Sequence, residues 1–297
     1  MKLIGVDIGG TKITAALIKG DKIVNQHTCP TPFDQEKMVV ADAVVKTISA
    51  VFDPEIKGIG IGVPGLVDLR NGTVVDVVNI PSWDVVPLKK LMEERFGKPV
   101  YVNNDANCFA VGEKYFGKGK AFKNFVGITI GTGLGAGIVI NGHLYSGSFC
   151  GAGEFGSMYY RDDKAEAYAS GQFFKDRNLS GTEQYQLAKT GDKKALELFN
   201  ELGGHIGRTI ANVLYALAPE AIILGGSVTK SFLLFKQGIF SVLEKEFLYP
   251  GLYKSLQIEI SELENSAIWG AASLVLDEVN LSFTAHQSLI KGTDKAL

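Results

Sequence analysis

Residues 3–12 read LIGVDIGGTK, and this stretch decides the fold. The apolar run from Leu3 to Ile8 has the length of a strand, and apolar and polar residues alternate again from Ile13. The pattern predicts a β-hairpin whose turn, Gly9-Gly10, has no side-chain bulk. Adjacent glycines bring backbone N–H groups close to whatever lies above a turn. The stretch therefore fits both an ordinary tight hairpin and a phosphate-binding turn.

The carboxylate of Asp7 favours phosphate binding over the plain hairpin. An aspartate inside an apolar strand needs a partner, such as Mg²⁺ or a lysine, to offset the cost of its desolvation. Thr11 and Lys12 follow the two glycines and add a hydroxyl and a cation to the turn. We therefore expect residues 9–12 to bind a phosphate group.

Length and composition are those of a globular enzyme. With 297 residues, and at about 100–200 residues per domain, the chain is expected to form two domains. A formal net charge of −2 argues against a general attraction to nucleic acid or to an anionic membrane. No apolar run approaches the ~18 residues of a membrane span, and Met1-Lys2 leads directly into the first strand. We expect a cytoplasmic protein.

A polar cluster, NNDAN at residues 103–107, separates a short apolar strand from a helical pattern. Asp105 therefore lies near the positive end of a helix, which favours its ionised form. A lone aspartate at this position is commonly a helix cap, and the alternative role is a general base. The amides of Asn103, Asn104 and Asn107 favour the base, because one capping oxygen would suffice. These amides could also hold a polyol.

The glycine-rich pattern returns about 120 residues later, where residues 125–137 read FVGITIGTGLGAG. Residues 131–136 match a dinucleotide fingerprint in letters, but a strand follows them where that fingerprint requires a helix. A P-loop is excluded because neither turn contains a Gly-Lys-Ser/Thr triplet. Two hairpins of one kind predict a duplicated domain that presents a glycine-rich turn to each end of one polyphosphate.

Three further features complete the pattern, and the first two have open interpretations. Glu154 and Glu166 lie near glycine-rich backbone and are either solvated charges or ligands. The pair Gly225-Gly226 follows a buried strand and is either a plain turn or a flat surface for a nucleobase. Residues 28–32, TCPTP, cannot continue a central strand beyond the one expected at 22–27.

Four motifs, in this order and over almost the whole chain, resemble the ROK family of sugar kinases within the actin/hexokinase-like ATPase superfamily. They are DIGGTK at 7–12, NDANxxAxxE at 104–113, GTGLG at 131–135 and LGGS at 224–227. The resemblance implies an α/β fold, namely the two-domain actin-like ATPase (ribonuclease H-like) fold with a central cleft. It implies a small sugar and phosphate domain at 1–115, completed by a C-terminal helix at about 266–297, and a large nucleotide-binding domain at 116–265.

The resemblance and the chemistry of phosphoryl transfer together assign roles to individual residues. Asp105 would be the catalytic base, and Asp7 would hold Mg²⁺, through water. The residues expected to bind ATP are Gly9, Gly10, Thr11, Lys12, Gly131, Thr132 and Gly133 at the phosphates, and Gly225 and Gly226 at the adenine or ribose. The residues expected to bind the sugar are Gly65, Asn79, Asn104, Asp105, Glu154 and Glu166.

The chain departs from the zinc-containing members of that family. Those members have Gly-His at the position of Gly156-Ser157 and a cysteine-rich run after it, whereas residues 158–164 contain no cysteine here. The three cysteines, at 29, 108 and 150, are too widely spaced to suggest a zinc site or a disulfide framework. We expect no structural zinc. The sugar-contacting histidine of many relatives is also absent, so this motif leaves the substrate open.

The expected function is ATP-dependent phosphorylation of a hexose at its primary hydroxyl, with glucose as the substrate and ATP and Mg²⁺ as cofactors. Alternatives of the same class are kinases for N-acetylmannosamine, N-acetylglucosamine, fructose or allose. A non-catalytic sugar sensor is the alternative of another class, and an actin-like filament former is disfavoured by the polar junction at 103–107. The resemblance also implies a homodimer. The first hairpin begins at residue 3, so the helix-turn-helix of family repressors, and with it nucleic-acid binding, is not expected.

Overall fold

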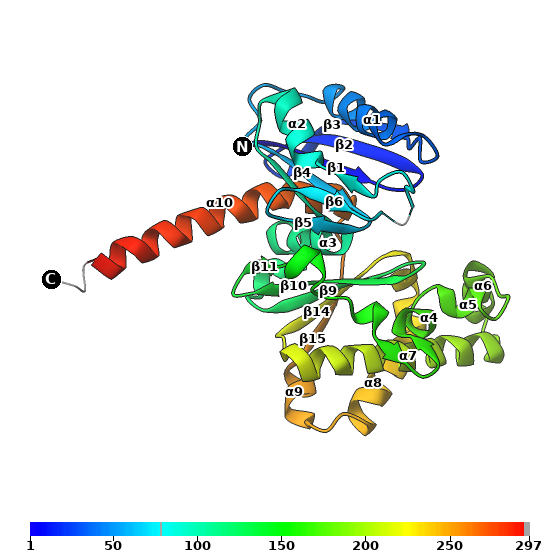
Figure 1. The fold of residues 1–297 in the computed structure, drawn as a ribbon. Helices are drawn as coiled ribbons and strands as arrows, with labels where there is room; N and C mark the ends of the chain where they lie inside the picture. Colours follow the sequence, from blue (N-terminus) through cyan, green and yellow to red (C-terminus); the bar gives the residue numbers. More distant parts are fainter. Residues whose placement is uncertain (78, 294–297) are drawn as a thin grey trace. The chain divides into compact units, whose positions relative to one another are not determined.

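The computed structural model describes residues 1–77 and 79–293, with side chains placed up to residue 281. The chain divides into two units, which Figure 1 shows in the colours of the sequence. The first unit comprises Met1–Lys120, Asn141–Ala152 and Leu263–Leu297, and the second comprises Ala121–Ile140 and Gly153–Glu262. These units differ from the expected domains chiefly at residues 141–152, which belong to the first unit. The assignment of sugar to one domain and nucleotide to the other stays a prediction.

The first unit is built on a five-stranded sheet of order β3-β2-β1-β4-β8. Its strands are β1 (Lys2–Ile8), β2 (Lys12–Lys19), β3 (Lys22–Pro30), β4 (Ile59–Val63) and β8 (Val100–Asn104). The first three strands are antiparallel, and β4 and β8 run parallel to β1. Strand β3 continues three residues past the expected end at His27. It can include Pro30 because it lies at the edge of the sheet, where a missing N–H breaks no ladder.

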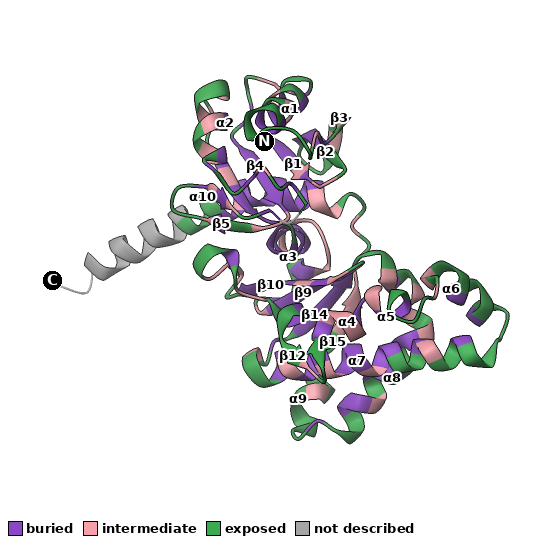
Figure 2. Cartoon of the chain, turned by 45° about the vertical axis from the view of Figure 1, so that its right-hand side comes forward, coloured by how far each residue is buried: buried purple, intermediate pink, exposed green. Residues whose placement is uncertain are grey.

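Helices cover both faces of this sheet. They are α1 (Lys37–Ser49), α2 (Leu88–Phe96), α3 (Asp105–Tyr115) and α10 (Ser266–Thr293). Because side chains alternate along a strand, Ile4 and Val6 join the core under α1 and α2, whereas Leu3 packs with Trp269 of α10. Gly5 and Gly60 lack the side chains that would collide with the backbone of α10. Figure 2 shows the buried strands of this core.

Smaller elements complete the first unit. A second sheet has the order β5-β6-β7, made of β5 (Leu66–Asp68), β6 (Thr73–Val75) and β7 (Val85–Val86). A short strand β11 (His143–Tyr145) and a 3-10 helix η2 (Ser148–Cys150) come from the inserted segment, and η1 (Lys118–Ala121) ends the first stretch.

The second unit repeats the strand pattern of the first. Its strands follow the order β10-β9-β14-β15, with β9 (Phe125–Ile130), β10 (Leu134–Ile140), β14 (Ala221–Gly225) and β15 (Gln257–Ile260). The pair β9–β10 is antiparallel, and β14 and β15 run parallel to β9, as β4 and β8 do to β1. The duplication predicted from the two hairpins is therefore confirmed.

The remaining elements of the second unit are mostly helices, together with the hairpin β12–β13. Their bounds are η3 (Phe155–Ser157), β12 (Tyr159–Tyr160), β13 (Asp163–Lys164), α4 (Ala165–Ala169), α5 (Gln172–Lys175), α6 (Gly181–Lys189), α7 (Lys193–Leu217), η4 (Ser227–Ser231), α8 (Phe232–Lys245) and α9 (Pro250–Ser255). Helix α7 begins after Asp192, whose carboxylate accepts a hydrogen bond from the Ala195 N–H at 2.9 Å.

Two expectations concern the chain as a whole. None of the helices in the described part of the chain is both long and apolar enough to cross a membrane. Residues 282–297 carry little periodicity in the sequence, which predicts a docked or partly disordered end. This prediction lies outside the residues whose side chains the structure describes.

Candidate functional site

The turn between β1 and β2 contains the first expected phosphate site. The Gly9 N–H donates to the Lys12 carbonyl at 2.9 Å, which closes the turn. A Cβ on Gly10 would lie 2.6 Å from the Cβ of Asn79, so Gly10 is required for this loop to rest on the turn. Asn79, expected to bind sugar, therefore lies directly against the expected phosphate turn, and Thr11 and Lys12 are exposed beside it.

Asp7 lies at the end of β1, just before this turn, and is paired with Thr14 across the hairpin. Its pKa is raised to about 6, mainly by burial and in addition by the negative charge of Asp105, while the positive charge of Lys12 opposes the rise. The three expected site residues therefore influence one another electrostatically within the first unit.

In the cluster at 103–107, the residue that caps the helix is not Asp105. The N-cap of α3 is Asn104, whose Oδ1 accepts from the Asn107 N–H at 2.7 Å. The Asn104 Nδ2 donates to the Cys150 carbonyl at 3.2 Å, so both ends of this buried amide are bonded within the protein. Asp105 is exposed on the first turn of α3, and its Oδ1 accepts from the Ala106 N–H at 2.8 Å. Of the two roles open to Asp105, the cap is occupied by its neighbour.

Gly65 lies in the turn between β4 and β5, where its N–H donates to the Val63 carbonyl at 3.1 Å. The space for a Cβ is occupied by the carbonyl of Asp76. Packing alone thus explains a glycine here, and its expected contact with the sugar stays a prediction.

The turn between β9 and β10 contains the second expected phosphate site. The Gly131 N–H donates to the Gly133 carbonyl at 3.0 Å and closes this turn, just as the bond from Gly9 to Lys12 closes the first turn. A Cβ on Gly133 would lie 2.7 Å from Oε2 of Glu166, and the same oxygen accepts from the Leu134 N–H at 3.4 Å. Glu166, expected to bind sugar, therefore lies beside this turn, where a cavity of 380 Å³ is lined by both.

The other expected sugar ligand of the second unit is more open to solvent. Glu154 is exposed, and its Oε2 accepts from the Ser157 hydroxyl at 3.1 Å. Ser157, at the position where the resemblance implies a histidine in many relatives, is therefore bonded to the expected ligand.

The pair Gly225-Gly226 ends β14 beside the second turn. Gly226 has φ of 92° and passes so close to the carbonyl of Ile130 that a Cβ would collide with it. Ser227 and Val228, which follow the pair, line a larger cavity. The glycines therefore bring η4 against the turn, and a contact between them and adenine stays a prediction.

That larger cavity, of 660 Å³, lies wholly within the second unit and reaches the turn at Gly131 and Thr132. Its walls include Phe174 and Phe199, whose ring centroids are 5.2 Å apart, and Tyr185. Two lysines and several hydroxyls also line it: Lys175, Lys230, Ser180, Thr182, Ser227 and Ser231. A hollow with aromatic walls that ends at a glycine-rich turn suits a base at one end and phosphates at the other. Sequence reasoning missed these aromatic residues, because they belong to helices with no motif.

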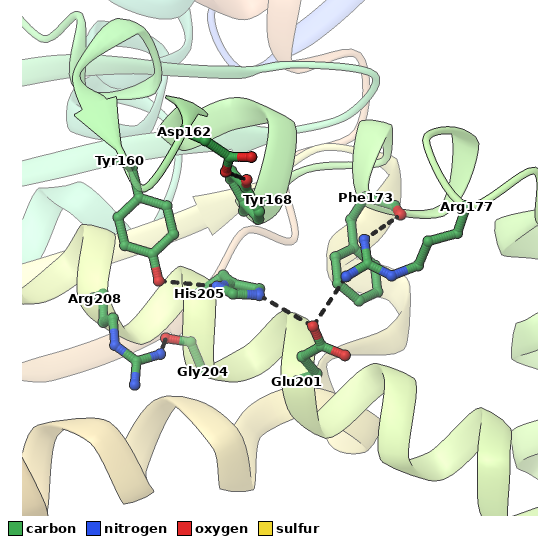
Figure 3. A network of polar contacts seen from close by, with 9 residues as sticks. All are labelled: Tyr160, Asp162, Tyr168, Phe173, Arg177, Glu201, Gly204, His205 and Arg208. Carbon is green, nitrogen blue, oxygen red and sulfur yellow. Dashed lines mark hydrogen bonds and ion pairs between the residues drawn. The ribbon is translucent and has the colours of Figure 1, made fainter.

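Hydrogen bonds and ring contacts around His205 anchor residues 158–164, the segment without cysteines, through Tyr160 (Figure 3). The buried ring of His205, on α7, pairs through Nδ1 with the Tyr160 hydroxyl at 3.0 Å and through Nε2 with Glu201 at 3.5 Å. The rings of Tyr160, Tyr168 and Phe173 lie 5.3–5.9 Å from it. Burial lowers the pKa of His205. The network ties β12 and α4, the helix that carries Glu166, to α7.

Within the described residues, no group of three or more His, Cys, Asp or Glu side chains is arranged to hold a metal ion. A single carboxylate with water ligands, as expected for Mg²⁺ at Asp7, is a different kind of site. The raised pKa of Asp7 indicates a carboxylate whose charged form needs a cation nearby, so the residues present fit this ion.

Comparison with known proteins places these features in a family. The model of the ROK family matches residues 3–278. A glucokinase of Thermotoga maritima is 30% identical over 319 residues, covering 94% of this chain and 98% of its own. A xylose repressor of Caldicellulosiruptor bescii is 30% identical over 322 residues, covering 96% of this chain and 80% of its own.

Among solved structures, a ROK family glucokinase from Streptomyces griseus, in complex with glucose and AMPPNP, is similar with a TM-score of 0.77. It is 30% identical, and the match covers 92% of this chain and 99% of that one. The expected actin-like ATPase fold is thereby confirmed.

Proposed function

We propose that this chain, which belongs to the ROK family, catalyses the ATP-dependent phosphorylation of glucose at its primary hydroxyl. The observation that carries the proposal is the repeated hairpin turn, one copy beside Asp7 and Asp105 and the other opening into the 660 Å³ cavity. The glucose and AMPPNP bound by the Streptomyces griseus relative support both ligands.

Asp105 is the catalytic base of the proposed reaction. Its carboxylate accepts the proton of the sugar's primary hydroxyl as that oxygen attacks the γ-phosphate, an effect typically worth about 10²–10⁴-fold. The capping of α3 by Asn104 supports this role, because it leaves Asp105 on the exposed first turn of the helix. Asp7 would hold Mg²⁺ through water, and the ion would neutralise charge on the phosphates.

The two turns bind the phosphates through backbone N–H groups. Because the amides of Gly9 and Gly131 close their own turns, we assign the phosphate contacts mainly to the residues that follow them. These are Gly10 and Thr11 in the first turn and Thr132 and Gly133 in the second. Lys12 adds positive charge, and the adenine lies in the aromatic cavity near Ser227.

The sugar is bound by hydroxyl contacts with the remaining expected residues, which are Gly65, Asn79, Asn104, Glu154 and Glu166. A sugar that lacks one of the matching hydroxyls leaves a polar group of the site unpaired, and this generates specificity. The first unit then carries most of these sugar contacts, and the second unit holds the adenine.

A coupled assay of ADP release over glucose, fructose, allose, mannose, N-acetylglucosamine and N-acetylmannosamine tests the proposal. We expect the highest kcat/KM with glucose. A higher kcat/KM with another sugar would change the assigned substrate but not the proposed reaction. If no sugar leads to ADP release, the proposed reaction is rejected.

A second candidate is a sugar sensor without catalysis, which the similarity to a xylose repressor supports. Calorimetric titration with glucose and xylose separates the two functions. A sensor binds one of them without releasing ADP, whereas a kinase releases ADP with the sugar that it binds. We also propose that the chain is cytoplasmic and forms a homodimer. Light scattering of the purified protein tests the homodimer.

A further inference from the structure

We infer that Thr31 and Ser170 are positioning residues. The hydroxyl of each donates a hydrogen bond to a carbonyl group of one phosphate turn and holds that group in place, and we call this contact a tie. The inference rests on the proposed function and extends it to two side chains outside the turns. Neither belongs to one of the four motifs at 7–12, 104–113, 131–135 and 224–227, and the two lie in different units.

The first tie is made by Thr31, which directly follows β3 and is 5% exposed. Its hydroxyl donates to the Gly9 carbonyl at 2.6 Å, and its backbone N–H donates to the Thr11 carbonyl at 3.0 Å. Together with the Gly9 N–H, which holds the Lys12 carbonyl, these bonds fix three carbonyl groups on the protein side of the first turn.

The second tie repeats the first with different residues. Ser170, between α4 and α5, is fully buried, and its hydroxyl donates to the Thr132 carbonyl at 2.8 Å. The next N–H, from Gly171, donates to the Gly131 carbonyl at 2.8 Å. With the Gly133 carbonyl held by Gly131, three carbonyl groups of the second turn are fixed as well.

The ties matter because a peptide presents either its N–H or its carbonyl to a bound group. A carbonyl oxygen carries partial negative charge, so one that swings toward a phosphate repels it. Glycine-rich turns are the segments most free to make such a swing. A buried hydroxyl that holds the carbonyl also prevents it from being left without a donor. Both turns are thus kept in the orientation that suits an anion.

The test compares the binding of ATP and of adenosine to Thr31→Val and Ser170→Ala by calorimetric titration without sugar. Each variant removes one hydroxyl at nearly constant volume and keeps the backbone N–H bonds. We expect each variant to bind ATP about tenfold more weakly, the effect of about one lost hydrogen bond, and adenosine within about twofold of the wild type. Thr31→Ser, which keeps the hydroxyl, should bind ATP as the wild type does.

Matched controls come from buried hydroxyls that hold helix carbonyls elsewhere. Thr47 donates to Ala43 at 2.7 Å, and Ser273 donates to Trp269 at 2.7 Å. Thr47→Val and Ser273→Ala should leave both affinities unchanged. If Thr31→Val and Ser170→Ala bind ATP as tightly as the wild type, or lose adenosine binding in parallel with ATP binding, the inference is overturned. If the wild type binds ATP but phosphorylates no hexose, the proposed reaction fails while this comparison is still decided by the binding data.

Discussion

Asp7 is the residue at which the demands of the site and of stability conflict. Its pKa is raised to about 6, mainly by burial and further by Asp105, so its charged form is unfavourable in the folded chain. In the unfolded chain the same carboxyl has an ordinary pKa near 4. As the pH rises from about 4 to about 6, the unfolded chain loses this proton and the folded chain keeps it. Asp7 therefore lowers stability above pH 6 and has no such effect below pH 4.

We predict that Asp7→Asn unfolds in urea with a free energy about 2–3 kcal/mol higher than that of the wild type at pH 7.5, without divalent cations. The difference should shrink as the pH falls and vanish near pH 4. Parallel urea titrations at pH 7.5, 5.5 and 4 measure it. If the variant is less stable than the wild type at pH 7.5, the charged form of Asp7 is not unfavourable in the folded chain.

The residues around Asp105 mark how far sequence reasoning reaches at this scale. The strand-to-helix junction and its polar character are local features, so the sequence predicts them. Which of Asn104 and Asp105 caps the helix depends on where each side chain points, and Asn104 takes the cap because its amide also reaches Cys150, 46 residues away. Nothing in the spacing of the motif reveals that contact.

At the scale of elements, the two hairpins are predictable because glycine placement and alternation act within a few residues. The aromatic cavity is not, because Phe174, Tyr185 and Phe199 come from three helices that meet only in the folded unit. The ties from Thr31 and Ser170 are hidden for the same reason.

The first turn allows a direct test of its packing. Gly10→Ala adds a Cβ only 2.6 Å from that of Asn79, so the loop at 79 must move. Since Gly10 and Asn79 are both expected site residues, we predict that the substitution lowers kcat/KM by about tenfold or more. Gly251→Ala is the matched control, because no atom lies within 4 Å of the added Cβ. Equal activity of the two variants would mean that the turn tolerates the shift.

The network on α7 has a measurable dependence on pH. Since burial lowers the pKa of His205, the unfolded chain takes up a proton below about pH 6.5 that the folded chain resists. Stability from a neutral His205 is therefore present above pH 6.5 and is lost as the pH falls. The charged groups that act on the ring are Glu201, which favours its protonation, and Arg161 and Arg208, which oppose it.

We predict that the wild type loses stability relative to His205→Gln as the pH is lowered from 7 to 5, because glutamine keeps a polar head and does not titrate. Urea unfolding of both proteins at these two values measures the change. Titrations of other groups, Asp7 included, are common to both proteins and cancel in the difference. A difference that stays constant would show that His205 does not resist protonation.

At the scale of the whole molecule, the described strands give each unit the same arrangement of an antiparallel pair followed by two parallel strands. The sequence shows this duplication through its two glycine-rich turns. It does not show that residues 141–152 belong with the first unit, because that assignment depends on long-range contacts. The choice of sugar is hidden for a related reason, since small shifts of loops decide which hydroxyl is matched.

The proposed reaction depends on one carboxylate at the start of α3. The most direct measurement compares ADP release and glucose binding by the wild type and by Asp105→Asn, which keeps the size of the side chain and removes its basicity. We predict that turnover falls by at least about 10²-fold while the affinity for glucose stays within about threefold. Turnover close to that of the wild type would contradict the assignment of Asp105 as the base and, with it, the proposed mechanism.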